Sequence, residues 1–169
     1  HLLGLFERSH MEYEADRARD AAGEPSLAEM TAKAIDIVAR EPRGYFLMVE
    51  GGRIDHSHAA GNAYRALTDT IAFADAVQAA LDATDAKDTL IVVTADHSHT
   101  LSFAGYPVRG NPILGKVHGG ADFEGGGHEL ARDQTGLPYT TLAYANGPGY
   151  PGASDRQPEG PKKYPHSYS

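Results

Sequence analysis

The chain contains no cysteine and no tryptophan among its 169 residues. The lack of cysteine excludes disulfide bonds and thiolate zinc sites within this stretch. No apolar run approaches the roughly 18 residues expected of a membrane-spanning helix. Nine histidines and 23 acidic residues leave imidazole and carboxylate as the side chains able to bind a metal ion.

Positive charge is also scarce. The chain has 15 lysines and arginines and 23 acidic residues, so its net charge is −8. This balance argues against a nucleic-acid-binding surface, because phosphate backbones are bound by basic patches. The electrostatic field of this net negative charge would also repel an anionic substrate. A protein acting on phosphate compounds would therefore need local cations, and bound metal ions are the obvious source.

The remaining composition is that of an ordinary globular protein, with 41% hydrophobic and 22% charged residues. The length fits one domain or part of one. The chain opens with His1 and carries no signal peptide, so we expect an internal piece of a longer protein.

Two helices and two strands are predicted before residue 100. Ser26 precedes an amphipathic pattern with apolar residues from Leu27 to Val38, which is typical of a helix and is ended by Pro42 and Gly44. The apolar runs 45–49 and 89–94 each predict a strand buried on both faces. A second helix is expected between them, over about 60–83. Its predicted inner face is Tyr64, Leu67, Ile71, Ala74 and Leu81.

The order strand, helix, strand predicts a βαβ unit, and therefore an α/β fold with a mostly parallel sheet. From residue 106 onward glycine and proline become dense, and 139–144 is one strand-like run. We therefore expect an α/β core over 1–105 and an irregular Gly/Pro-rich surface subdomain over 106–169.

Acidic and histidine side chains follow both predicted strands. Glu50 and Asp55 come after the first strand, and Asp96 and His97 come after the second. Parallel strands bring their carboxyl ends to one sheet edge, so these four side chains are expected to converge. Zinc accepts imidazole and carboxylate, and magnesium prefers oxygen ligands. The alternative is structural: Asp-His as a turn or helix cap, and Glu50 as a solvated loop acid.

Two segments carry a family resemblance. Phe46 to His56 (FLMVEGGRIDH) and Val93 to His99 (VTADHSH) resemble metal-ligand blocks of the alkaline phosphatases, in the branch that includes the animal enzymes. The resemblance continues through 4–7, 63–68, 105–110 and 145–150, and so covers residues 1 to about 150. It implies a three-layer αβα sandwich with a mostly parallel sheet, plus a smaller, irregular, crown-like subdomain.

The resemblance also implies roles for individual residues. Glu50 matches the ligand of one Mg²⁺, and Asp55 matches a ligand of one of two Zn²⁺ ions. Asp96 and His97 match two ligands of the second Zn²⁺. His56 lies where animal-type members have a histidine beside the magnesium site, a supporting role.

Three further residues match a calcium-type site of the same branch: Phe6 through its carbonyl, Glu7, and Glu24, which replaces an aspartate. The alternative for this trio is ordinary surface acids.

The sequence departs from the family at one zinc ligand. Members carry a histidine four residues after the equivalent of Asp55, and here that residue is Ala59. Either this zinc is weakened or His58, one residue earlier, replaces the ligand by a changed backbone path. No residue matches the family's serine nucleophile, its arginine or its final histidine ligand. No catalytic residue is therefore assigned in this fragment, which is expected to be incomplete alone.

By resemblance, the function is hydrolysis of phosphate monoesters through a phosphoserine intermediate, with two zinc ions and one magnesium ion. A homodimer is also implied, with Tyr106 reaching toward the partner's active-site entrance, and so is a periplasmic or extracellular location. Two alternatives stay open. One is another metallohydrolase of the same superfamily, such as a phosphodiesterase or sulfatase-like enzyme. The other is a degenerate metal-binding homologue, for which Ala59 is the ground.

Overall fold

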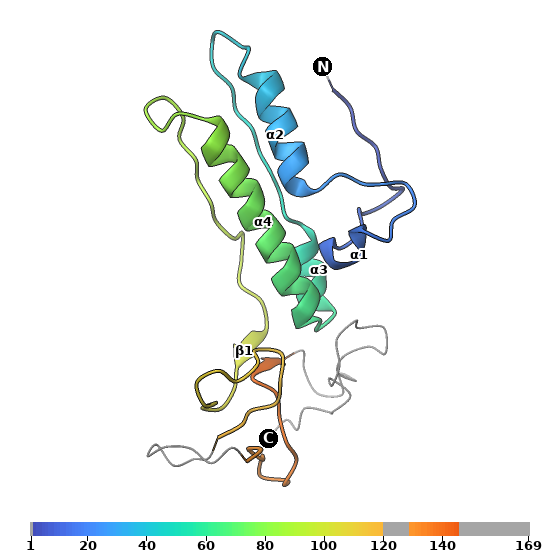
Figure 1. Ribbon diagram of the computed structural model, residues 1–169, viewed down its shortest axis with the longest axis vertical. Coiled ribbons are helices and arrows are strands. Elements are labelled where there is room, and N and C mark those ends of the chain that lie inside the picture. The colour runs from blue at the N-terminus through green and yellow to red at the C-terminus, as the bar shows by residue number, and fades with distance from the viewer. Residues whose placement is uncertain (1, 120–128, 146–169) are drawn as a thin grey trace. The chain divides into compact units, whose positions relative to one another are not determined.

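The computed structural model describes residues 2–119 and 129–145 (Figure 1). Its elements, in order, are α1 (Glu14–Arg17), α2 (Leu27–Val38), α3 (Arg53–Ala59), α4 (Ala63–Ala83), β1 (Leu101–Phe103) and β2 (Leu142–Tyr144). The chain divides into two compact units. The first unit comprises His1–Ile54 and Arg65–Ser98, and the second comprises Asp55–Tyr64 and His99–Ser169. This mixed content of helices and a small sheet is compatible with part of an α/β fold.

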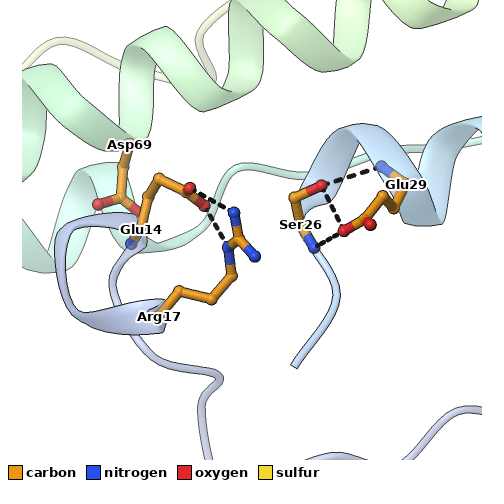
Figure 2. A network of polar contacts seen from close by, with 5 residues as sticks. All are labelled: Glu14, Arg17, Ser26, Glu29 and Asp69. Atoms are coloured by element: carbon orange, nitrogen blue, oxygen red, sulfur yellow. Dashed lines mark hydrogen bonds and ion pairs between the residues drawn. The ribbon is translucent and has the colours of Figure 1, made fainter. Parts of the chain in front are cut away.

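Helix α2 confirms the prediction for residues 27–38. The Ser26 hydroxyl accepts a hydrogen bond from the Glu29 amide at 3.2 Å, and the Glu29 carboxylate accepts one from the Ser26 amide at 2.7 Å (Figure 2). This reciprocal capping box satisfies backbone donors that the first turn leaves without helical partners. Thr31 and Ile35 are the buried residues of the helix.

Helix α4 confirms the second predicted helix, but its predicted inner face is wrong. Ile71 is 61% exposed and Leu81 is 51% exposed, whereas Ala66 and Ala76 are buried. The error has a physical cause, since apolar residues occur on more than one side of α4 and periodicity cannot tell which side is covered. Among the described helices, none combines the length and apolarity needed to cross a membrane.

A charged network attaches α1 to the start of α3 and to α4 within the first unit. The Tyr13 ring lies between two guanidinium groups, with Arg53 at 3.8 Å and Arg65 at 4.5 Å from its centroid. Arg65 Nη2 also lies 2.6 Å from Oδ2 of the buried Asp16. These cation–π and ionic contacts hold α1, which is only one turn long, in position within the first unit.

Asp69 of α4 is the unusual acid beside this network. Its Oδ1 accepts a hydrogen bond from the Glu14 amide at 3.5 Å, and Figure 2 shows the two side chains next to one another. Its buried Oδ2 has no hydrogen-bond partner in the described part of the chain. Burial raises the pKa of Asp69 to about 6, and the Glu14 carboxylate adds to this; the amide bond and two arginines oppose it.

The strands predicted at 45–49 and 89–94 are not formed, and the prediction that they are buried is wrong. Within residues 2–119 and 129–145 the only strands are β1 and β2. Phe46 is 90% exposed and Leu90 is 87% exposed. Both runs have the composition that favours strands, yet a strand also requires a neighbour to complete its backbone hydrogen bonds. Neither run pairs with a described segment.

The second unit is built on an antiparallel strand pair. Leu101 of β1 is opposite Tyr144 of β2, and Phe103 is opposite Leu142 (Figure 1). The strand-like run predicted at 139–144 is confirmed in part, since β2 forms its end. Val117, Leu142 and Tyr144 are the buried hydrophobic side chains of this part of the unit.

Candidate metal centre

The predicted ligands Asp96 and His97 lie side by side in the first unit. His97 Nδ1 lies 2.8 Å from the Ser98 carbonyl oxygen. A carbonyl only accepts, so Nδ1 carries the proton and Nε2 of the neutral ring carries the lone pair. His97 Nε2 is 3.4 Å from Asp96 Oδ2, close to the roughly 3.3 Å edge of a tetrahedral zinc site with bonds of about 2.0 Å. The pair therefore fits two ligands of one zinc ion.

Asp55 lies on α3 and belongs to the second unit, where it faces a different histidine. Its Oδ1 is 3.8 Å from His99 Nε2. The Thr100 amide donates a hydrogen bond to His99 Nδ1 at 2.9 Å, so the proton of the neutral His99 ring is on Nε2. His99 thus directs an N–H toward Asp55, whereas His97 directs a lone pair toward Asp96.

His58 is the third histidine of this region. Its Nδ1 is 2.8 Å from the hydroxyl oxygen of Tyr144. Its ring stacks on that of His99, with centroids 5.3 Å apart and planes at 24°. Burial, followed by the neighbouring His99, lowers the pKa of His58, while Asp55 acts in the opposite direction. The neutral ring is therefore favoured at neutral pH.

The remaining predicted ligands are less organised. Glu50 is exposed in the first unit. Its carboxylate lies beside Gly52, with Oε1 3.3 Å from the position that a Cβ would take there. His56 is half-buried on α3, and its carbonyl accepts a hydrogen bond from the Ala60 amide at 3.0 Å. Across the described ranges, no group of three or more histidine, aspartate or glutamate side chains is arranged to hold a metal ion. Of the predicted ligands, the structure places Asp96 beside His97.

Glu24 is the informative member of the calcium-type trio. It is 4% exposed, and its Oε2 accepts a hydrogen bond from the Glu12 amide at 2.8 Å. Its Oε1 is buried and has no hydrogen-bond partner among the described residues. A buried carboxylate oxygen needs a partner, and a cation would supply one. Phe6 and Glu7 are both exposed.

Sequence reasoning missed the contact between His99 and Asp55 and gave Tyr144 no role. A signal for His99 was present, because it ends the same Asp96–His99 block. Tyr144 had none, since its partner His58 is 86 residues away in sequence.

Comparison with known proteins identifies a family. Residues 1–161 match the family model of alkaline phosphatase. The tissue-nonspecific alkaline phosphatase isozyme of Gallus gallus is 47% identical over 149 residues, which are 88% of this chain and 26% of that protein. The membrane-bound alkaline phosphatase of Bombyx mori is 45% identical over 149 residues, 88% of this chain and 24% of that protein.

The human tissue-nonspecific isozyme gives a similar result, with 44% identity over 150 residues, 89% of this chain and 26% of that protein. The chain spans about a quarter of the length of these curated relatives. The family model covers nearly the whole chain, including every predicted ligand. The chain belongs to the alkaline phosphatase family.

Proposed function

We propose that the protein hydrolyses phosphate monoesters through a phosphoserine intermediate, with two zinc ions and one magnesium ion. The observation that supports this most directly is the family match over residues 1–161, together with relatives that are named alkaline phosphatases. In this proposal the chain contributes metal ligands, and the nucleophile is assigned to none of its residues.

The proposed ligands follow from donor chemistry. Asp96 and His97 hold one zinc ion, since the Ser98 carbonyl keeps the imidazole proton on Nδ1 and leaves the Nε2 lone pair beside the carboxylate. Asp55 holds the other zinc ion, and Glu50 supplies oxygen to the magnesium ion, with His56 in support. When bound, such ions polarise phosphoryl oxygens and offset the net charge of −8.

We further propose that the full-length protein adopts a three-layer αβα sandwich with a mostly parallel sheet, since the chain matches the alkaline phosphatase family model. This sheet would gather the four ligands at one edge. Residues 1–105 then belong to the core and 106–169 to the crown-like subdomain.

The proposal extends to assembly and location. The exposed Tyr106 suits an interface in a homodimer. An extracellular or periplasmic site is proposed from the family, and one similar protein, that of Bombyx mori, is named membrane-bound. The buried Glu24 Oε1, which has no hydrogen-bond partner within 2–119 and 129–145, supports an additional Ca²⁺ site.

The test uses the full-length protein with p-nitrophenyl phosphate, bis-p-nitrophenyl phosphate and p-nitrophenyl sulfate, alongside metal analysis. We expect the monoester to turn over fastest, with activity lost on chelation and restored by zinc and magnesium. Faster turnover of the diester or sulfate would replace the proposal with the phosphodiesterase or sulfatase-like alternative. Metal binding without turnover of any substrate would favour a degenerate homologue, for which Ala59 is the ground.

A further inference from the structure

Four side chains of the second unit form a continuous series from β2 to α3: Tyr144, His58, His99 and Asp55. We propose that Tyr144 and His58 are positioning residues that hold His99 against Asp55, and that His58 does not replace the histidine ligand missing at Ala59. The identity of the metal at Asp55 rests on the proposed function, while the arrangement of the four side chains does not.

The series begins at a fixed point. Tyr144 is 5% exposed and its backbone is paired with Leu101 in the β1–β2 ladder. Its hydroxyl lies 2.8 Å from His58 Nδ1, a normal length for a hydrogen bond to a ring nitrogen. One nitrogen of His58 is therefore engaged by a group that the core holds in place.

The second step is the contact between the two histidine rings. His58 stacks on His99 at 5.3 Å, which restricts rotation of the His99 ring about its side-chain bonds. The Thr100 amide fixes the same ring through Nδ1. Two contacts thus determine where the His99 Nε2–H group points.

The third step acts on Asp55. The distance of 3.8 Å from His99 Nε2 to Asp55 Oδ1 exceeds a direct hydrogen bond, so the effect is electrostatic attraction of the carboxylate. Groups that orient a metal-binding carboxylate or histidine without touching the metal commonly change metal affinity by about 10–100-fold. The Asp55 side chain is 50% exposed.

The same geometry argues against His58 as a ligand. His58 and Ala59 both lie near the helix face of Asp55, three and four residues after it on α3, so helix spacing alone does not choose between them. His58 is committed to Tyr144 and to the face of His99. Although the three side chains are neighbours, Asp55, His58 and His99 do not form a metal-holding group in the described part of the chain.

The first experiment measures zinc affinity of the full-length protein by chelator competition. Tyr144→Phe keeps the buried ring and removes only the hydroxyl, and Tyr139→Phe is the matched control, since that hydroxyl lies beside Gly105. We expect about tenfold weaker binding at one zinc site for Tyr144→Phe and no change for Tyr139→Phe. His58→Gln and the double variant should match Tyr144→Phe, because both act through one series.

Zinc X-ray absorption then separates the two roles of His58. A positioning role leaves the number of imidazoles bound per zinc unchanged in His58→Gln. Loss of an imidazole ligand in that variant would overturn the proposal, and so would zinc affinity in Tyr144→Phe equal to that of the control.

A metal-free measurement keeps the inference testable if the protein binds no zinc. In ¹⁵N NMR of the histidine rings, Tyr144→Phe should shift the His58 Nδ1 resonance and alter that of His99, while Tyr139→Phe should alter neither. Unchanged histidine resonances in Tyr144→Phe would overturn the proposal whatever the metal content. A protein without zinc but with the expected shifts would contradict only the proposed function.

Discussion

Two histidines separated by one residue illustrate how backbone contacts decide the chemistry of a side chain. His97 meets a carbonyl at Nδ1 and presents a lone pair at Nε2, whereas His99 meets an amide at Nδ1 and presents a proton at Nε2. The amino-acid type is the same, but only the first arrangement suits a zinc ligand.

The proposed ligand role of Asp96 predicts the outcome of its removal. In the full-length protein, Asp96→Ala should lose one zinc per chain and most activity, because it leaves His97 without the neighbouring carboxylate. Elemental analysis and p-nitrophenyl phosphate turnover measure both effects. Asp75→Ala, an exposed aspartate of α4, is the control and should change neither. An unchanged zinc content in Asp96→Ala would remove Asp96 from the ligand set.

Ala59 predicts a gain of function. Since Ala59 lies one helical turn after Asp55 on α3, Ala59→His should place an imidazole on the same face. We expect zinc affinity to rise by about tenfold or more, as measured by competition with a chelator. If affinity and turnover stay the same, another group already fills that position, which would also count against the positioning role of His58.

At the scale of elements, predictability follows the range of the interactions. The helix after Ser26 and the helix expected over about 60–83 were predicted because apolar periodicity is a local signal. The strands at 45–49 and 89–94 were predicted from composition alone, and composition cannot supply a hydrogen-bonding neighbour. Helix α3 was missed because its short sequence, RIDHSHA, shows no apolar periodicity.

In the candidate site, too, residues close in sequence could be predicted and contacts between distant residues could not. Asp55, Asp96 and His97 could be proposed from contiguous blocks, and Asp96 with His97 form a pair that fits zinc. The bond from His58 to Tyr144 could not, because residues 86 apart leave no pattern in one sequence. Convergence of the four predicted ligands stays a prediction.

The α1–α4 contact predicts a pH dependence. The pKa of Asp69 is about 6 in the folded protein and 3.8 for the ordinary side chain, so the folded state holds an extra proton between these values. Stability therefore falls as pH rises from about 4 to about 6. Asp69→Asn should remove this slope and stabilise the protein at pH 7.5 by about 1 kcal/mol, a figure reduced for partial solvent exposure.

Thermal denaturation at pH 4.5 and pH 7.5 provides the measurement. The melting temperature of Asp69→Asn should exceed that of the wild type at pH 7.5 but not at pH 4.5. Asp75→Asn on the same helix is exposed and should follow the wild type at both values. Equal melting temperatures for Asp69→Asn and the wild type at pH 7.5 would mean that Asp69 has an ordinary pKa.

For the whole molecule, the proposed homodimer is the feature most open to test. Light scattering of the full-length protein should give twice the chain mass at micromolar concentration, and a monomer would refute the dimer. Tyr106→Ala removes a large exposed side chain and should weaken dimerisation or alter turnover. If it changes neither, Tyr106 has no interface role. Arg109→Ala, exposed nearby in sequence, is a suitable control.

The division of the second unit into 55–64 and 99–169 has a consequence for the order of folding. Contacts between distant residues form slowly because loop closure must precede them. During synthesis, His58 leaves the ribosome long before Tyr144 can reach it. Asp96 and His97 are adjacent in sequence, so no loop has to close before they meet. In a nascent chain the proposed zinc ligands Asp96 and His97 would thus be adjacent before the histidine stack beside Asp55 exists.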